Sequence, residues 1–499
     1  MSADSTQSAT APAAGALRRG FARGVRDNMA AEVATQAVRV GGMVLLARAL
    51  EPRNFGVFRA LLVLSMLVSL CNDAGICDAL IQRADLRPEH TATAWWLSLG
   101  LSALCALALF AGAPLVARWM GMPELVLGMR LLCVPQMLEG SLITANARLQ
   151  RELRFGVLAL ADVLAEVAFL ATALTMLYCG HRDACLPAAL AMRMAVHAVT
   201  VWVIAGPPAI ARPRTRAARD FGGFAATSLG GRLVFLLSNN ADYLIVGRLL
   251  GSTALGFYSI AWDLLRFIPD RLYKVAGRVA FPAFCKLQHD DHELARAYLQ
   301  FFGYLARIVM PLMGCVVVAA PELLAVVYGA KWLPAALPLR LLAAGLMLAG
   351  LTVGIGPVYY TKGRPGFDLY LHGLRLLLVV AVCVGFSRFG LRGVSASMGV
   401  VEGGIGVTGC WMAASLIGVG MTRVLRAAAA GARLALLCAG CALASKWLLD
   451  AIGLSGPAAL PLIGLPAAAL FCWSEAGQLI DMIIVRAPRS APSPSIQGA

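Results

Sequence analysis

Apolar runs of 18 or more residues recur along the whole chain, and each could cross about 30 Å of hydrocarbon as a helix. Only 14% of the 499 residues are charged, whereas a water-soluble protein of this size needs about 25% to cover its surface. These two features predict an all-α polytopic membrane protein.

A hydropathy window of about 19 residues predicts about fourteen transmembrane helices. Their ranges are 28–50, 56–81, 91–117, 124–147, 156–178, 184–206, 221–247, 254–284, 297–320, 334–361, 366–386, 391–419, 427–450 and 457–484. Proline, glycine and charged residues mark nearly every junction between them. The longest hydrophilic links, around 207–220 and 285–296, are too short to hold a domain.

Lysine and arginine are distributed unevenly between the two sides of this arrangement. About 21 lie on the side of the termini and about 7 on the other, among them Arg53, Arg118 and Arg182. The positive-inside rule therefore places both termini in the cytoplasm, in agreement with an even number of spans. Residues 1–27 lack the apolar core of a signal peptide and form a cytoplasmic tail, and residues 486–499 read as a disordered cytoplasmic tail.

Two segments of the chain are repeated further along it. "LLARALEPRNFGVFRA" at residues 45–60 matches residues 245–260 at an offset of about 200, which pairs Arg48 with Arg248 and Gly56 with Gly256. "RLLCVPQMLEG" at residues 130–140 matches "RLLAAGLMLAG" at residues 340–350, at an offset of about 210. A maintained register indicates a tandem duplication.

The duplication predicts the domain organisation. Two pseudo-symmetric six-helix bundles, residues 28–206 and 221–419, are joined by a basic cytoplasmic linker at 207–220 and followed by two additional transmembrane helices at 420–485. Because each bundle has an even number of spans, both share one orientation and are related by an axis along the membrane normal.

Cofactor, metal and nucleic-acid sites are not expected. The net charge of +16 comes from arginine clusters between apolar segments, and the chain has no basic patch interleaved with aromatic residues. The 13 cysteines include no C-x-x-C motif or zinc spacing, and most lie singly in apolar runs. Cys179 and Cys185 flank one short external loop, where either a disulfide or two unpaired thiols are compatible with the sequence.

Ionisable side chains at membrane depth are costly and usually face a bundle interior or a water-filled cavity. The first two helices of each half carry such groups at helical spacing, which predicts a central, wet cavity rich in arginine. The residues that we single out are Glu32, Gln36 and Arg39 in the first helix, Asp73 in the second, Arg232, Asn239 and Asp242 in the seventh, and Asp263 and Arg266 in the eighth. Arginine forks can hold phosphate, and carboxylates and amides can hydrogen-bond sugars.

A structural role is an alternative for individual members of this set. Arg39 could pair within the protein, and Arg48 and Arg248, at helix ends, could extend to the interface. Exposing the whole set of ionisable side chains to lipid would cost a prohibitive amount of free energy. The prediction therefore concerns the cavity more than any single residue.

Four stretches resemble a known family: residues 46–83, 151–167, 239–288 and 326–335. They are similar to the bacterial polysaccharide transporter family, the Wzx-type flippases of the multidrug/oligosaccharidyl-lipid/polysaccharide (MOP) exporter superfamily, over roughly residues 20–420. The branch it looks similar to exports exopolysaccharides of the colanic acid, teichuronic acid or xanthan type. Its motifs are diffuse, and no catalytic residue can be carried over.

The resemblance implies a transporter of the bacterial inner membrane, not an enzyme. Its substrate would be an undecaprenyl-diphosphate-type lipid-linked oligosaccharide, moved by alternating access under an ion gradient, with polysaccharide polymerase and export machinery as candidate partners. On this hypothesis Arg39, Arg232 and Arg266 contact the diphosphate or acidic sugars, with Gln36 and Asn239 also lining the cavity. Glu32, Asp73, Asp242 and Asp263 are then candidates for proton or sodium coupling.

Two other functions remain open. A multidrug antiporter of the same superfamily would favour acidic and aromatic groups for cationic drugs over arginine. A membrane polysaccharide polymerase or ligase would need a sizeable external loop or a clustered acid–base set, and the external loops predicted here are short.

Overall fold

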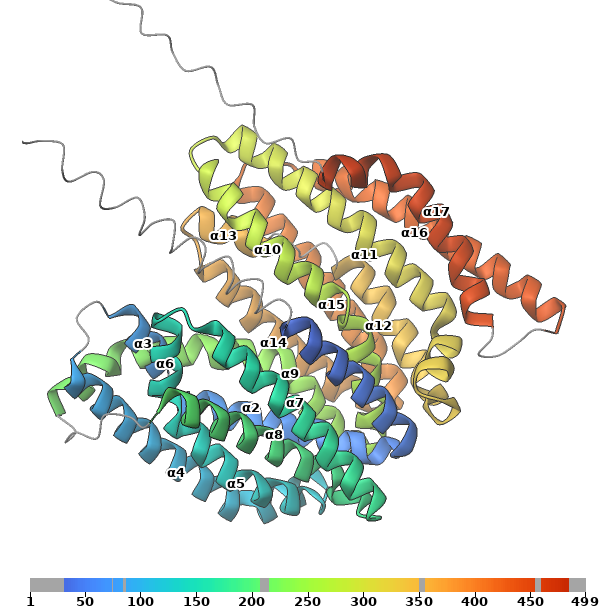
Figure 1. Ribbon diagram of the computed structural model, residues 1–499. Helices are drawn as coiled ribbons and strands as arrows, with labels where there is room; N and C mark the ends of the chain where they lie inside the picture. The colour runs from blue at the N-terminus through green and yellow to red at the C-terminus, as the bar shows by residue number, and fades with distance from the viewer. Residues whose placement is uncertain are drawn as a thin grey trace, which may run out of the picture.

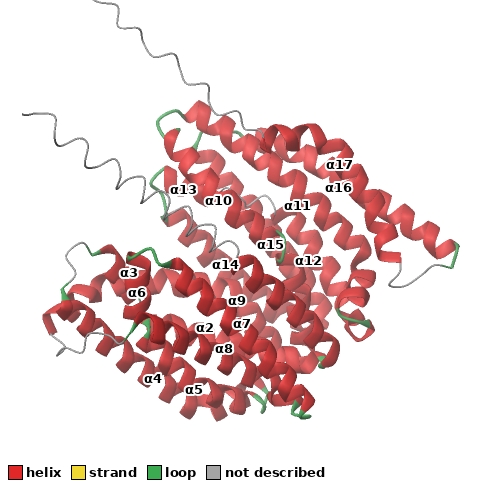
Figure 2. Cartoon of the chain, in the orientation of Figure 1, coloured by secondary structure: helices red, strands yellow, loops and turns green. Residues whose placement is uncertain are grey.

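The computed structural model describes residues 31–73, 75–83, 87–206, 215–349, 355–453 and 459–483. These residues form helices and loops and contain no strand (Figure 2). The chain starts with a helix at residues 31–49. The following helices of the first half are α2 (Pro52–Asp73), α3 (Ile76–Gln82), α4 (Pro88–Met120), α5 (Leu125–Ser141), α6 (Ile143–Arg151), α7 (Phe155–Tyr178) and α8 (Arg182–Ala205).

The second half repeats this pattern with longer helices. Its elements are α9 (Thr215–Arg266), α10 (Pro269–Lys286), α11 (Asp291–Val327), the 3-10 helix η1 (Ala330–Ala335), α12 (Ala336–Ala349), α13 (Ile355–Thr361), α14 (Gly366–Phe386), the short η3 (Ser387–Phe389) and α15 (Gly390–Leu416). Two further helices, α16 (Met421–Ala451) and α17 (Ala459–Ile483), pack against α11. The predicted tails at 1–27 and 486–499, and most of the linker at 207–220, lie outside the described residues.

The all-α, polytopic fold is confirmed. Within the described ranges, nine helices are long and apolar enough to cross a membrane, and α5 with α6 forms a tenth if this pair, bent by 44°, is one span. Two of the nine contain a non-helical glycine, Gly251 (φ 85°) in α9 and Gly390 (φ 65°) between η3 and α15. Each of these two segments therefore holds two straight pieces, as the sequence predicts, but the total of fourteen spans remains a prediction.

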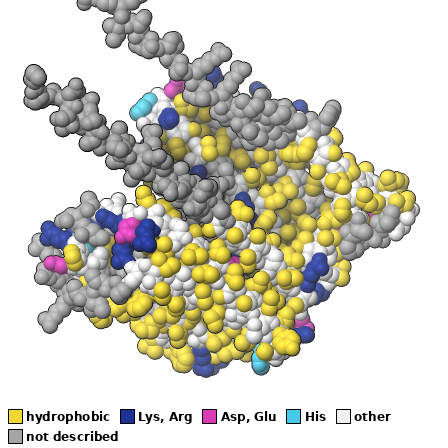
Figure 3. Space-filling view, viewed as in Figure 1, with side chains coloured by type: hydrophobic (Ala, Val, Ile, Leu, Met, Phe, Trp, Pro, Cys, Tyr) yellow, Lys and Arg dark blue, Asp and Glu magenta, His cyan; other side chains and the backbone are white. Residues whose placement is uncertain are grey.

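The helices gather in two groups (Figure 1). In this view α2–α8 lie below, α10, α11 and α15–α17 lie above, and α9 and α14 lie between. Within the first half α4 packs on α5, α5 on α8, and α7 on α8; within the second, α11 packs on α12, α12 on α15, and α14 on α9. Hydrophobic side chains cover most of the visible surface, and clusters of charged residues lie toward its edges (Figure 3).

The duplicated glycines form a reciprocal contact between the halves. A Cβ atom at Gly56 would overlap the carbonyl oxygen of Ser252, and a Cβ at Gly256 would overlap the carbonyl oxygen of Pro52. Pro52 and Ser252 are themselves related by the offset of 200 positions. The helices α2 and α9 thus cross at equivalent points, as a two-fold relation between the halves requires.

The same end of the molecule joins the halves by hydrogen bonds to backbone carbonyls. The indole nitrogen of Trp332 donates to Ala47 at 2.9 Å, and the Lys331 ammonium donates to Leu50 at 2.6 Å. At the equivalent place in the other half, Gly247 faces the side chains of Met120 and Met122. The charge distribution predicts that this end is external.

We expect Gly56→Ala and Gly256→Ala each to destabilise the protein by roughly 1–3 kcal/mol or more, because each new methyl group would overlap a backbone oxygen that belongs to a packed helix. The measurement is thermal unfolding of the purified protein in detergent, followed by tryptophan fluorescence. Gly100→Ala is the matched control, since Gly100 lies inside α4 with nothing within 4 Å of a Cβ. Equal unfolding temperatures for all three variants would contradict the close crossing.

Candidate functional site

A polar pocket of about 520 Å³ lies inside the second half. Its walls come from six helices. They are α9, on both sides of its break at Gly251, and α10, α12, α13, α14 and α15. Two of the predicted site residues, Asn239 and Arg266, line it. Its other polar lining residues are Asp270, Tyr273, Asp368, His372, Arg375 and Glu402.

An ion pair between α14 and α15 anchors this pocket. The guanidinium of Arg375 pairs with the carboxylate of Glu402, and the two side chains are only 6% and 12% exposed. The other nitrogen of Arg375 donates to the backbone carbonyl of Ser238 and, at 3.3 Å, to the Asn239 side chain. Breaking such a buried pair leaves an uncompensated charge, so the pair fixes α9, α14 and α15 relative to one another.

Two further charges surround this pair. Asp242 is fully buried and accepts a hydrogen bond from the hydroxyl of Tyr258 at 2.8 Å, while its second oxygen has no hydrogen-bond partner among the described residues. The guanidinium of Arg266 stacks over the Trp262 ring at 4.3 Å and has no ion-pair partner in the described part of the chain. The lining therefore contains two arginines, Arg266 and Arg375, and three acids, Asp270, Asp368 and Glu402. Of the two arginines, only Arg375 has an ion-pair partner among the described residues.

The first half contains a second cluster. Glu166 on α7, 5% exposed at its side chain, binds Arg39 from the first helix at 3.0 Å and lies 3.8 Å from Arg193 on α8. Two arginines thus share one carboxylate. One turn before Glu166, Asp162 lies 3.6 Å from His197.

The two clusters occupy equivalent places with their charges exchanged. Glu166 and Arg375 are 209 positions apart, and so are Arg193 and Glu402. Arg39 and Asn239, which contact Glu166 and Arg375 respectively, are 200 positions apart. The same three helices of each half are tied together, but the first cluster carries one net positive charge and the second is neutral.

Three contacts between side chains cross from one half to the other, in addition to the bonds from Trp332 and Lys331 to backbone carbonyls. Arg59 on α2 pairs with Asp263 on α9, and its guanidinium also lies over the Tyr243 ring. Near the end opposite to Trp332, Arg232 bridges Asp73 and Asp78. At the same end, Arg271 donates to the side chain of Gln36.

The structure thus places the nine predicted residues in four environments. Asn239, Arg266 and Asp242 lie in or beside the pocket, and Arg39 lies in the cluster of the first half. Gln36, Asp73, Arg232 and Asp263 form contacts between the halves. Glu32 is exposed, and its only hydrogen bond to a described residue is with Gln36, at 3.5 Å. No contact gathers the nine around one chamber, and their shared function stays a prediction.

Sequence reasoning missed Arg59, Arg375 and Glu402. Glu402 is the only acidic residue in the predicted helix 391–419. A lone charge inside an apolar run requires a partner, and this signal could have identified it. Cys179 and Cys185 are free thiols in the structure, the first exposed and the second buried. Within the described residues no group of His, Cys, Asp and Glu could hold a metal ion.

The fold is that of the MOP superfamily transporters. The lipid II flippase MurJ in an inward closed conformation aligns over 91% of this chain and all of its own, with a TM-score of 0.64 and 12% identity. The inward-facing conformation of a multidrug resistance MATE family transporter aligns over 77% of this chain and 94% of its own, with a TM-score of 0.62 and 15% identity. The chain is accordingly a multi-pass membrane protein with a transporter fold.

The chain belongs to the polysaccharide biosynthesis protein family, whose profile matches residues 45–337. It is 28% identical to the teichuronic acid biosynthesis protein TuaB of Bacillus subtilis over 62% of this chain and 66% of that protein. It is 24% identical to the lipopolysaccharide biosynthesis protein WzxC of Escherichia coli over 72% of this chain and 74% of the relative. The succinoglycan biosynthesis transport protein ExoT of Rhizobium meliloti is 25% identical over 62% of this chain and 63% of that protein. These relatives and structural neighbours are biosynthetic transport proteins and flippases, not enzymes.

We expect Arg375→Leu to destabilise the protein by about 3–5 kcal/mol, because Glu402 would stay buried without its partner. The double variant Arg375→Leu, Glu402→Leu should recover most of this loss, since it buries no unpaired charge. The difference is read from thermal unfolding temperatures in the same detergent. A double variant no more stable than Arg375→Leu alone would contradict the energetic coupling of the pair.

Proposed function

We propose that the protein flips polyprenyl-diphosphate-linked oligosaccharide repeat units from the inner to the outer leaflet of the bacterial inner membrane. The product would serve the synthesis of an exopolysaccharide or lipopolysaccharide. Two observations carry the proposal: the match to the polysaccharide biosynthesis family, and the polar pocket of the second half, whose Arg375–Glu402 pair has a charge-exchanged counterpart in the first half. Both termini would lie in the cytoplasm, and polymerase and export machinery would receive the product.

The chemistry of the two clusters suits the two parts of such a substrate. A diphosphate needs cations whose charge is not fully compensated, and Arg39 and Arg266 are the candidates. Arg39 shares the single carboxylate of Glu166 with Arg193, and Arg266 stacks on the Trp262 ring without an ion-pair partner in the described part of the chain. Sugar hydroxyls need neutral or acidic hydrogen-bonding groups, which Asn239, His372 and Glu402 supply in the pocket.

The contacts between the halves suit alternating access. Arg232 and Gln36 are engaged across the two halves in this conformation, and they would become available to substrate only when the halves separate at this end. The units that move would be the two predicted bundles, 28–206 and 221–419, with α16 and α17 following α11. Transport would then alternate between inward-open and outward-open arrangements around the close contact of Gly56 and Gly256.

An ion gradient is the proposed source of energy, and Asp242 is the candidate acid best placed for coupling. One of its oxygens lacks a hydrogen bond inside a fully buried site. Asp73 and Asp263 are occupied by arginines, and Glu32 is exposed. A buried carboxylate with a free oxygen can take up a proton or a small cation, and its charge then changes with the state of the transporter.

The second candidate function is multidrug antiport, favoured by the MATE neighbour. The same pocket offers aromatic groups, Phe235, Trp262 and Tyr273, to an organic cation. The acids Asp270, Asp368 and Glu402 in the lining would also suit a cation. We place the flippase first because the chain belongs to the polysaccharide biosynthesis family.

Deletion of the gene should trap lipid-linked oligosaccharide in the cytoplasmic leaflet, and the intact gene should release it. In the complemented strain, Arg39→Gln and Arg266→Gln should each lower export roughly tenfold or more, the value of one lost charge-assisted hydrogen bond. The measurement is the amount of exported polysaccharide, together with the lipid-linked pool that a membrane-impermeant, sugar-modifying reagent added outside cannot reach. Arg388→Gln is the control, because Arg388 is an exposed residue of η3 outside the pocket. Wild-type export by both pocket variants would exclude their arginines from binding.

Asp242→Asn should abolish the dependence of transport on the ion gradient, because the amide cannot take up a proton or balance a cation. Tyr258→Phe is the paired control: it removes the hydrogen bond to Asp242 but leaves the carboxylate. Flipping is measured in proteoliposomes with and without an imposed proton or sodium gradient. If Asp242→Asn responds to the gradient like the wild type, another acid performs the coupling.

A further inference from the structure

A second pocket lies on the first half, away from the polar clusters. Its volume is about 380 Å³, and it is formed by α3, the start of α4, the end of α5, α6 and the end of α8. The polar and aromatic residues of its lining are Arg87, Thr91, Ser141, Thr144, Arg148, Arg151, Glu152 and Trp202. None of the residues discussed for transport lines it.

The pocket lies at the depth of the lipid headgroups. The apolar helix α4 starts at Pro88 and α8 ends at Ala205, so both leave the hydrocarbon region beside the pocket. Trp202, 43% exposed, stands at its rim, and amphipathic indole rings are typical of the membrane interface. This is the side on which the arginine count is high, and it would face the cytoplasmic leaflet, which is rich in anionic lipids.

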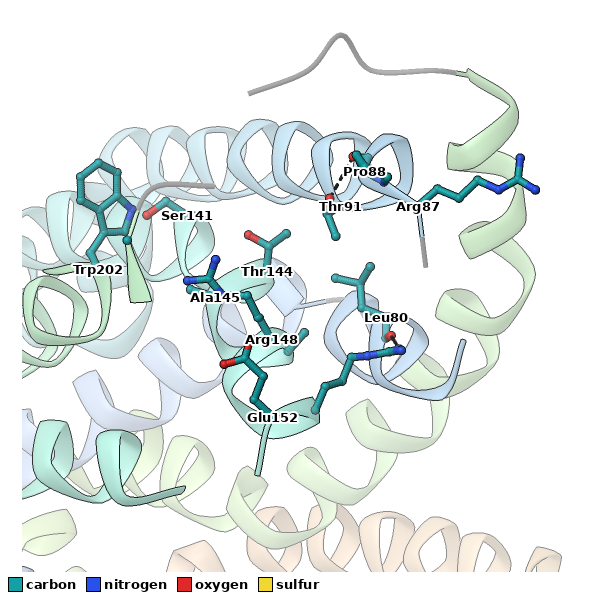
Figure 4. Close-up of a pocket in the computed structure, with 13 residues that line it drawn as sticks. Leu80, Arg87, Pro88, Thr91, Ser141, Thr144, Ala145, Arg148, Glu152 and Trp202 are labelled. Atoms are coloured by element: carbon teal, nitrogen blue, oxygen red, sulfur yellow. Dashed lines mark hydrogen bonds between the residues drawn. The ribbon is translucent and has the colours of Figure 1, made fainter. Parts of the chain in front are cut away.

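Two groups in the pocket have no partner in the protein. The guanidinium of Arg148 makes no hydrogen bond or ion pair with any residue that the structure describes, although Arg151 beside it caps the carbonyls of Leu80 and Arg83. Thr144 is only 9% exposed, and its hydroxyl also makes no hydrogen bond with a described residue. In Figure 4 both residues lie between Trp202 and the start of α4 at Pro88, with Ser141 nearby.

The charge of the pocket selects an anion. Two arginines of the lining, Arg148 and Arg151, accompany one acid, Glu152, which lies 3.6 Å from Arg154 outside the pocket. The third arginine, Arg87, points away from the pocket (Figure 4). A guanidinium and a threonine hydroxyl together are donors that match the oxygens of a phosphate group.

We propose that this pocket binds the phosphate of an anionic membrane phospholipid. Arg148 and Thr144 hold the phosphate oxygens, and Trp202 packs beside the glycerol and the upper acyl chain. A phospholipid is favoured over free phosphate because the pocket opens at the membrane interface beside an exposed indole ring. This assignment does not depend on the transported substrate.

The test is native mass spectrometry of the full chain released from detergent with phosphatidylglycerol or phosphatidylcholine. The wild type should retain phosphatidylglycerol in preference to phosphatidylcholine. Arg148→Gln should weaken the retained phosphatidylglycerol roughly fivefold, the usual value of one interfacial basic residue, and Thr144→Val should weaken it as well. Arg423→Gln, at an exposed arginine near the start of α16 and outside the pocket lining, is the control and should bind as the wild type does.

Three results would overturn the proposal. Equal retention by Arg148→Gln, Thr144→Val and the wild type would show that the lipid binds elsewhere. An equal loss in Arg423→Gln would reduce the effect to general surface charge. Inorganic phosphate that binds the wild type while phosphatidylglycerol fails to compete with it would assign the pocket to a soluble anion. Thermal unfolding of each variant, measured without added lipid, separates lost binding from lost folding.

Discussion

An ionised side chain in a membrane-spanning helix must find a partner inside the protein, and this requirement organises both halves of the molecule. In the first half Glu166 satisfies Arg39 and Arg193, and in the second Glu402 satisfies Arg375. Each set ties two consecutive helices to a third helix that lies more than 100 positions earlier in the sequence. Because hydrocarbon offers no alternative partner, these contacts decide which faces turn inward. The remaining apolar faces are free to meet lipid, as Figure 3 shows for one side.

The exchange of sign between the two clusters explains how duplicated halves can differ in function. The Coulomb energy of a pair does not depend on which helix carries the acid, so the exchange leaves the packing of α14 and α15 comparable with that of α7 and α8. The groups left over are not equivalent, however. The first half retains an arginine, Arg39, and the second an amide, Asn239. One scaffold therefore provides a site for an anion beside a site for neutral hydrogen-bonding groups, which is the combination that a phosphorylated glycolipid requires under the proposed function.

Local patterns predicted the helices and the duplication, but not the partners across helices. Hydropathy located the spans because burial in lipid acts on each segment separately, and the register that pairs Gly56 with Gly256 marked the crossing point. It did not predict the bends at Leu142 or Gly75, since both lie in largely apolar sequence and depend on how α5, α6 and α3 pack. Helical spacing puts Asp263 on one face of its helix, but it cannot tell that Arg59, 204 positions away, lies opposite. The ion pair between Arg375 and Glu402 was not predicted for the same reason.

The two ends of the molecule differ in how firmly they join the halves. At one end Trp332 and Lys331 donate to backbone carbonyls, and the glycine crossing leaves no space for even a methyl group. At the other end the halves are held by Arg232 and by the contact between Arg271 and Gln36, all on partly exposed side chains. Partly exposed ion pairs contribute about 0–1 kcal/mol, whereas closely packed backbones cannot separate without losing many contacts at once. Under the proposed alternating access, the halves would therefore part at the end of Arg232, and the opposite end would act as the pivot.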